Sequence, residues 1–301
     1  MRPIPYGKIP QVLLVGNGIN LSYGYDSWDK IVKNTEPVRT RRIREDSIKN
    51  MTLPMQIVVA SEDNVDICMH ELAKKYQEQE IKPEHKVFIK EMLTCPVDAI
   101  LTTNYSFEIE KTILEDFSAY NLRKLDRCLT EENSRQKQLR MFRCYELPLE
   151  NNPSLWHIHG NAFYKHSVIM GHYYYGKLLA EINEYIPKLL ARYNGCNKYE
   201  KDYVPRSWVD YFMLGDVHIV GMGMDLSEMD LWWLSCCKKR NFPDRLTRFY
   251  DPEFKDNQKS LLMNCYGIEE AREIKWNGDY PNYYRAIFES LKGKTCRDIY
   301  K

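Results

Sequence analysis

Short runs of apolar residues alternate along the chain with longer amphipathic segments. Four of these runs end in glycine or in small polar residues, which is typical of strands that lead into a turn at the edge of a sheet. A run of consecutive apolar residues suits a parallel strand that is covered on both faces. The four runs lie at residues 11–18, 98–102, 155–160 and 216–222.

The segments between these runs have helical spacing, for example at residues 72–79 and 86–93. The alternation of strand, polar tip and helix predicts an α/β fold with a doubly wound, Rossmann-like parallel sheet. Because no linker or repeat divides the chain, residues 1–301 are expected to form one domain with helical insertions around 31–96 and 173–210. Further strands are predicted at 141–147, 167–171, 246–250 and 273–275. Further helices are predicted to begin at 27 and to cover 259–265 and 283–291, and a loop is predicted at Asn194-Gly195.

Composition excludes several classes of protein. The formal charge of the 301 residues is +1, so direct nucleic-acid binding is not expected. No apolar run approaches the length of a membrane span and the first residues lack a signal-peptide core, which predicts a cytoplasmic protein without membrane contact. The nine cysteines are scattered without a C-x-x-C pair, so neither a disulfide framework nor a structural zinc site is expected.

The first apolar run leads into the turn Gly16-Asn17-Gly18, which Asn20 follows. Two glycines permit positive φ and close approach of the backbone, as a phosphate-binding turn requires. Leu21 stands where the dinucleotide-binding pattern G-x-G-x-x-G has its third glycine. By itself this turn is therefore a weak indication of nucleotide binding.

The second run ends in Thr103-Asn104-Tyr105. Polar residues at the carboxyl end of a parallel strand lie where open α/β sheets contact their ligands. The amide of Asn104 can donate and accept hydrogen bonds together, which suits a ribose hydroxyl or a water. The alternative is a structural role, in which Asn104 caps a helix that begins near Phe107.

The third run contains two histidines and no charged residue. Side chains two residues apart share a face of a strand, so His157 and His159 are expected to point the same way. Histidine titrates near neutral pH, which makes this segment the first candidate for a catalytic base. The alternative is a core histidine bonded to a backbone carbonyl. Gly160 permits close approach of a ligand or of backbone.

The fourth run ends in Gly221 and Gly223, and Asp225 follows before an expected helix. An acid after such a turn accepts from a ribose hydroxyl in dinucleotide-binding folds. Asp225 and Glu228 are equally compatible with a structural capping pair at the start of the helix.

The four tips are expected to converge, because the carboxyl ends of parallel strands fall on one edge of a sheet. Together they offer an anion cradle, an amide, a candidate base and candidate ribose acceptors. This inventory suits a dinucleotide better than a metal ion or an acyl substrate.

Taken in order, these segments resemble the motif set of the sirtuin superfamily, and most closely its zinc-free branch in bacterial antiphage defence. The motifs are Val15-Gly16-Asn17-Gly18-Ile19-Asn20 with Ser27-Trp28, Leu101-Thr102-Thr103-Asn104-Tyr105, and Trp156-His157-Ile158-His159-Gly160. The late segment is similar to the closing nucleotide motif of that branch and to the abortive-infection H family. It consists of Ile219-Val220-Gly221-Met222-Gly223 and Asp225-Leu226-Ser227-Glu228-Met229-Asp230-Leu231.

The resemblance implies that His159 matches the catalytic histidine and Asn104 the catalytic asparagine. It also implies that NAD binds at the four tips and that no zinc is held. The residues that match the NAD-binding turns are Gly16, Gly18, Asn20 and Gly223. The other candidate NAD-binding residues at the tips are Asn17, Thr103, Tyr105, His157, Gly221 and Asp225. The chain departs from the family pattern at three positions. Asn17 stands where classical sirtuins usually have alanine, Ser106 where many members have aspartate, and Asp225 where serine or threonine is common.

Classical deacylases use a zinc module to help form the acyl-lysine cleft, so its absence implies hydrolysis of NAD to nicotinamide and ADP-ribose. In this hypothesis Asn104 orients the ribose and water, while His159 acts as a base or a hydroxyl partner. The expected role is an NAD-depleting effector of antiphage defence. The 22 tyrosines and six tryptophans of the chain favour a homo-oligomer. A partner such as an ATPase is a further option.

Three other functions remain open from the sequence. The first is another NAD-dependent enzyme, which transfers ADP-ribose or removes acyl groups from lysine. The second is a sensor or scaffold that binds NAD or ADP-ribose without turnover. The third is an interaction subunit that binds no nucleotide and whose aromatic surface serves assembly with a partner such as an ATPase.

Overall fold

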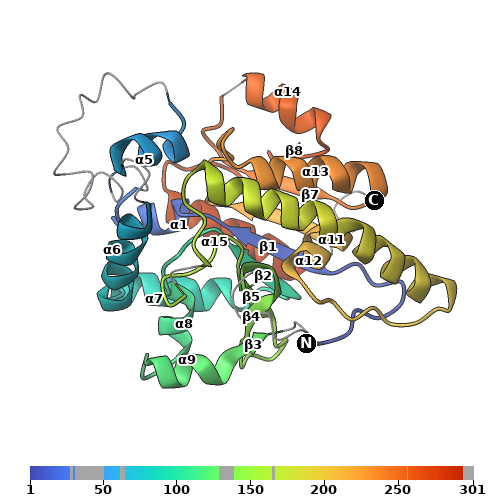
Figure 1. Ribbon diagram of the computed structural model, residues 1–301, viewed down its shortest axis with the longest axis horizontal. Helices are drawn as coiled ribbons and strands as arrows, with labels where there is room; N and C mark the ends of the chain where they lie inside the picture. The colour runs from blue at the N-terminus through green and yellow to red at the C-terminus, as the bar shows by residue number, and fades with distance from the viewer. Residues whose placement is uncertain are drawn as a thin grey trace.

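A mostly parallel sheet of eight strands forms the centre of the computed structural model, which describes residues 1–27, 30, 51–61, 65–128, 139–164, 167–255 and 257–293 (Figure 1). The order of strands across the sheet is β3-β4-β5-β2-β1-β6-β7-β8. The strands are β1 (Gln11–Val15), β2 (Ala99–Thr102), β3 (Asp126–Cys128), β4 (Arg143–Glu146), β5 (Ser154–His157), β6 (Asp216–Val220), β7 (Thr247–Tyr250) and β8 (Glu269–Glu270).

The parallel strands follow the order of a doubly wound fold. Numbered along the chain, they lie in the order third, second, first, fourth, fifth and sixth, with a reversal between β1 and β6. The predicted Rossmann-like α/β sheet is therefore confirmed. One correction is needed, because β3 and β4 extend the sheet with an antiparallel edge. Residues 147–153 join β4 to β5 and are too few for the crossover that a parallel pair requires.

Helices cover both faces of the sheet. They are α1 (Gly18–Leu21), α5 (Leu53–Ser61), α6 (Val65–Glu78), α7 (Pro83–Met92), α8 (Glu108–Ile113), α9 (Ala119–Leu125), α10 (Leu139–Phe142), α11 (His172–Lys198), α12 (Trp208–Leu214), α13 (Met229–Asn241), α14 (Asn257–Cys265) and α15 (Tyr280–Gly293). Along β1, Leu13 and Val15 pack with α7 and α15, whereas Val12 and Leu14 pack with α11, α12 and α13. No helix among these is both long enough and apolar enough to cross a bilayer.

Helix α11 differs from its prediction. The sequence predicts a loop at Asn194-Gly195, but one helix runs from His172 to Lys198 and includes Pro187. Buried side chains recur every three or four residues, so packing against the sheet outweighs the local cost of proline. These side chains are Tyr175, Leu178, Ile182, Tyr185, Ile186 and Leu189.

Two of the weaker strand predictions are wrong. Residues 167–171 form no strand and instead contact the segment that follows β5, where the Ile169 amide donates to His159 O at 2.8 Å. The last edge strand is Glu269–Glu270 and not 273–275. Most of the helix expected from Ser27-Trp28 lies outside the described residues, as do residues 31–50 of the first insertion.

The turns after β1 and β6 touch each other at the reversal point. The Gly18 amide donates to Gly221 O at 2.6 Å, and the Gly16 amide donates to Val220 O at 3.0 Å. A Cβ atom on Gly16 or on Gly18 would lie 2.6 Å from the Gly221 carbonyl oxygen. Backbone packing therefore requires both glycines, whatever else they contact.

Replacement of Gly18 by alanine is expected to destabilise the fold by about 1–3 kcal/mol, because the new methyl group overlaps the Gly221 carbonyl. Gly195→Ala, inside α11, is the matched control, since no atom lies within 4 Å of its new Cβ. The control should gain about 0.5–1 kcal/mol from the better helix former. Urea denaturation measures both changes, and a Gly18→Ala protein as stable as the wild type would contradict the packing role.

Candidate functional site

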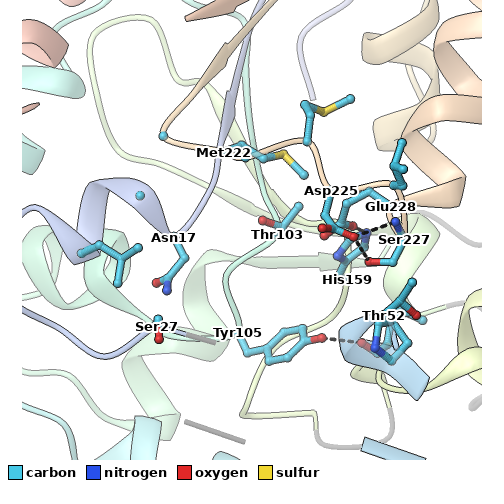
Figure 2. A pocket seen from close by; sticks show the side chains of 18 of the residues that line it. Asn17, Ser27, Thr52, Thr103, Tyr105, His159, Met222, Asp225, Ser227 and Glu228 are labelled. Atoms are coloured by element: carbon cyan, nitrogen blue, oxygen red, sulfur yellow. Dashed lines mark hydrogen bonds and ion pairs between the residues drawn. The ribbon is translucent and has the colours of Figure 1, made fainter. Parts of the chain in front are cut away.

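A cavity of about 930 Å³ opens at the reversal point of the sheet. It lies beyond the carboxyl ends of the central strands, where doubly wound sheets bind their ligands, and its volume suits a small molecule. Figure 2 shows side chains from the segments that follow β1, β2, β5 and β6 pointing into it. The predicted convergence of the tips is therefore confirmed. The predicted site residues in its wall are Asn17, Gly18, Thr103, Tyr105, His159, Gly221, Gly223 and Asp225.

The other four predicted site residues lie outside this wall. Gly16 packs against the turn after β6. Asn20 is buried and joins two elements, because its amide donates to Asn17 Oδ1 at 3.1 Å and to the Glu108 carboxylate of α8. Asn104, just after β2, and His157, at the end of β5, line a smaller cavity of about 20 Å³.

Asn104 is buried and does not cap a helix. Its amide nitrogen donates to Gly16 O at 3.4 Å, and its Oδ1 has no hydrogen-bond partner within the described ranges. Helix α8 begins at Glu108, and no side chain caps it. The structural alternative of a helix cap is therefore wrong for Asn104.

His157 is a buried core histidine. Its Nδ1 lies 2.7 Å from the backbone oxygen of Asn104, and its Nε2 lies 2.7 Å from Glu110 Oε1. Burial alone would lower the pKa of His157, but the Glu110 carboxylate and its hydrogen bond outweigh burial and raise the pKa above its usual value. The core-histidine alternative is thus confirmed for this residue.

The expectation that the two histidines share a face is wrong. Strand β5 ends at His157, and the Gly160 amide then donates to His157 O at 2.9 Å in a turn where φ of Gly160 is +82°. This turn brings His159 to the large cavity, whereas the His157 ring packs against Phe107 and Tyr145.

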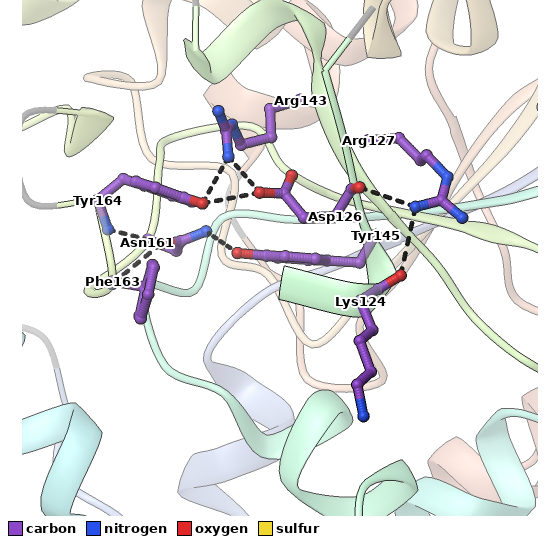
Figure 3. A network of polar contacts seen from close by, with 8 residues as sticks. All are labelled: Lys124, Asp126, Arg127, Arg143, Tyr145, Asn161, Phe163 and Tyr164. Atoms are coloured by element: carbon purple, nitrogen blue, oxygen red, sulfur yellow. Dashed lines mark hydrogen bonds and ion pairs between the residues drawn. The ribbon is translucent and has the colours of Figure 1, made fainter. Parts of the chain in front are cut away.

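A polar network holds the loop that follows the two histidines (Figure 3). Asn161 donates to the Tyr145 hydroxyl of β4 at 3.1 Å and accepts from the Tyr164 amide at 3.1 Å. The Tyr164 hydroxyl donates to Asp126 of β3 at 2.7 Å, and Arg143 of β4 contacts both of these side chains. The antiparallel edge strands therefore anchor the loop beside the cavity.

His159 meets two carboxylates in the cavity wall. Its Nε2 lies 2.9 Å from Asp230 Oδ2 and 3.8 Å from Glu228 Oε2. The Tyr175 hydroxyl donates to Glu228 Oε2 at 3.2 Å, and the Tyr175 ring packs edge-on against the imidazole. We call His159, Glu228 and Asp230 the histidine–acid cluster.

This cluster changes the proton affinity of its members. Burial lowers the pKa of His159, but the Asp230 carboxylate, its hydrogen bond and Glu228 together raise that pKa above its usual value. Burial raises the pKa of Glu228 to about 7; His159 opposes this shift, and Asp230 adds to it. The cluster therefore favours the protonated imidazole beside Asp230, and Glu228 is a second carboxyl group able to exchange a proton near neutral pH.

Sequence reasoning missed Asp230 and gave Glu228 at most a structural role. The predicted capping pair is wrong, because the Glu228 side chain makes no cap at the start of α13, and Asp225 accepts from the Ser227 amide at 2.8 Å. The available signal was three acids within six residues, directly after the glycines that end a buried strand. Their spacing does not show which of them meets His159.

Acidic side chains outnumber basic ones in the cavity wall. Asp225, Glu228 and Asp251 are acidic, whereas Lys259 is the one lysine or arginine among the described wall residues. Lys259 Nζ donates to Gly223 O at 3.2 Å. An anionic ligand group therefore has one nearby amine and the backbone amides of the glycine turns as partners.

The histidine–acid cluster is also, among the described residues, the one group whose donor atoms lie close enough together to hold a metal ion, within 4.8 Å of one another. However, the nitrogen that would bind a metal already lies at hydrogen-bond distance from Asp230. In this arrangement the cluster is a hydrogen-bonded acid–base group.

Comparison of the chain with protein-family models and with curated proteins finds no match. The resemblance to sirtuin-like proteins thus stays a prediction from motifs. The geometry supports a Rossmann-like sheet with a ligand-sized cavity at its reversal point.

Glu110→Gln is expected to destabilise the fold more at about pH 5.5 than at about pH 9. The pKa of His157 is higher in the folded state than in the unfolded chain, so its pairing with Glu110 stabilises the fold fully below the unfolded value of about 6.5. This contribution is lost as the pH rises through the folded pKa. Urea denaturation at both pH values measures the difference. The exposed Glu115→Gln serves as control, and a pH-independent loss in Glu110→Gln would contradict the assignment.

Proposed function

We propose that this protein is an NAD⁺ glycohydrolase, which cleaves the bond between nicotinamide and ribose to release nicotinamide and ADP-ribose. The observation that carries the proposal is the position of the His159–Asp230 pair in the wall of a cavity at the reversal point of the sheet. Dinucleotides bind at this point in doubly wound folds, and imidazole suits proton transfer near neutrality.

The cavity wall offers partners for each part of the dinucleotide. Asn17 and Thr103 supply an amide and a hydroxyl, and Asp225 and Asp251 supply carboxylates for ribose hydroxyls. Lys259 supplies a positive charge for the pyrophosphate. Nicotinamide leaves readily from its cationic form, so the reaction needs no strong general acid. A group that acts on the water or on the ribose is sufficient.

Asn104 keeps its place in the proposal as the residue that orients ribose and water. Its neighbour Thr103 lies in the cavity wall, and its own Oδ1 has no partner among the described residues. The side chain must turn from the small cavity toward the large one to reach the ligand.

Regulation by assembly forms part of the proposal, because uncontrolled loss of NAD would harm the host cell. Leu226, Met229 and Trp233 expose apolar side chains at the start of α13, close to the cavity. These side chains support self-association or the binding of a partner such as an ATPase. An NAD-depleting effector of antiphage defence remains the biological role we propose.

Wild-type protein incubated with NAD⁺ is expected to release nicotinamide and ADP-ribose in equal amounts. His159→Ala should reduce the rate by about 10²–10⁴-fold, because it removes the imidazole from the cavity. His70→Ala, on the exposed side of α6, is the matched control and should keep the wild-type rate. Chromatography of both products, in dilute and in concentrated samples, provides the measurement. EDTA should not change the rate.

Three results would contradict hydrolysis and identify another function. Binding of NAD⁺ without turnover at every protein concentration would indicate a sensor or an assembly subunit. Turnover that depends on an acyl-lysine peptide would indicate deacylation. Transfer of labelled ADP-ribose to protein would indicate a transferase.

A further inference from the structure

The two carboxylates of the histidine–acid cluster differ in their access to the cavity. Asp230 is fully buried, and its Oδ2 lies 2.9 Å from His159 Nε2. The side chain of Glu228 lies in the cavity wall, is 20% exposed, and places Oε2 3.8 Å from the same nitrogen. Because one ring nitrogen carries one proton, the nearer Asp230 takes this hydrogen bond. The Glu228 carboxylate is left facing the ligand space.

In this geometry Asp230 holds His159 toward its protonated form, which is a poor proton acceptor. A buried carboxylate at hydrogen-bond distance favours the protonated imidazole, in keeping with the raised pKa of His159. Both nitrogens of an imidazolium are donors, so it has no lone pair with which to take a proton.

Glu228 has the properties that His159 lacks. Its Oε2 accepts a hydrogen bond from the neutral Tyr175 hydroxyl at 3.2 Å, and no lysine or arginine of the described ranges forms an ion pair with it. Burial raises the pKa of Glu228 to about 7, and a general base is most effective when its pKa lies near the working pH.

We propose that Glu228 is the general base of the site, while Asp230 is a positioning residue that holds His159 as an imidazolium beside it. The proposal rests on the proposed NAD⁺ hydrolysis. The oxygen of a water forms a bond to C1′ of the ribose as the bond from C1′ to the nicotinamide nitrogen breaks. The bonding electron pair leaves with the ring, which becomes neutral nicotinamide. Glu228 accepts the proton of the attacking water and later releases it to solvent.

His159 then acts as the hydroxyl partner, donating a hydrogen bond to the ribose. The ionised Glu228 also places negative charge close to the ribose carbon, where positive charge develops as nicotinamide leaves. One carboxylate thus serves both the water and the developing cation.

The ionisation of Glu228 depends on groups from several elements. The neighbouring carboxylates raise its pKa, and the imidazolium and the hydrogen bond from tyrosine lower it. Because a general base must be ionised, the rate should rise with pH through about 7. The groups that face Glu228 are His159 after β5, Asp230 on α13, Tyr175 on α11, Asp225 after β6 and Tyr105 after β2.

The decisive experiment compares the pH profiles of NAD⁺ hydrolysis by wild type, Glu228→Gln and Glu184→Gln. Wild-type kcat should rise about tenfold per pH unit below pH 7 and then level off. Glu228→Gln should lose about 10²–10⁴-fold in kcat and also lose the pH step, with KM changed by less than about threefold. Glu184→Gln, on the exposed side of α11, should keep the wild-type profile.

Chemical rescue separates a proton acceptor from a residue needed only for folding. Formate added to Glu228→Ala should restore part of the rate, because a small carboxylate fits the space that the side chain leaves. Circular dichroism and NAD⁺ titration establish that the variants fold and bind.

The outcomes separate this inference from the proposed function. If wild type cleaves NAD⁺ and Glu228→Gln keeps both its rate and its pH step, Glu228 is not the base and the hydrolase stands. If the pH step disappears in His159→Gln and persists in Glu228→Gln, the base is His159. If wild type releases no nicotinamide under any condition, the proposed function itself is overturned.

Discussion

The backbone contact between two glycine turns sets the geometry on which the site depends. The turns follow the adjacent central strands β1 and β6, and the hydrogen bond from Gly18 to Gly221 leaves no space for a Cβ atom between them. Since the chain reverses its direction across the sheet at this point, helices leave β1 and β6 on opposite faces. A cavity therefore opens between the tips, and every wall residue is placed relative to this contact.

Two histidines near the strand tips are each paired with a buried carboxylate, but they lie in different surroundings. His157 is held by Glu110 on one side of the end of β5, and His159 is held by Asp230 at the cavity. Each carboxylate offsets the cost of burying a charged imidazole. Because the backbone turns at Gly160, the first histidine supports the core and the second faces the space for a ligand.

The site retains polar atoms that the fold does not satisfy. Asn104 Oδ1, Glu110 Oε2 and Asp230 Oδ1 are buried without a partner among the described residues. Each such atom costs about 1–3 kcal/mol relative to a hydrogen-bonded one. Other buried polar atoms without a partner among the described residues lie in the apolar layers, for example both ring nitrogens of His85 and Trp208 Nε1. Asn104 and Glu110 line the small cavity, where their unpartnered oxygens leave hydrogen-bonding capacity unused.

The amino-acid sequence by itself determined the central strands, their glycine and polar tips, and the meeting of those tips at one edge. These features are local, because a run of apolar residues and the glycine after it lie within a few positions of each other. Only the tertiary structure decided that β5 ends at His157, that α11 continues through Asn194-Gly195, and that Asp230 meets His159. This last pair is separated by 71 positions in the chain, and the packing of α13 beside the end of β5 brings its members together. No spacing along the chain encodes such a contact, since it depends on how the whole sheet packs.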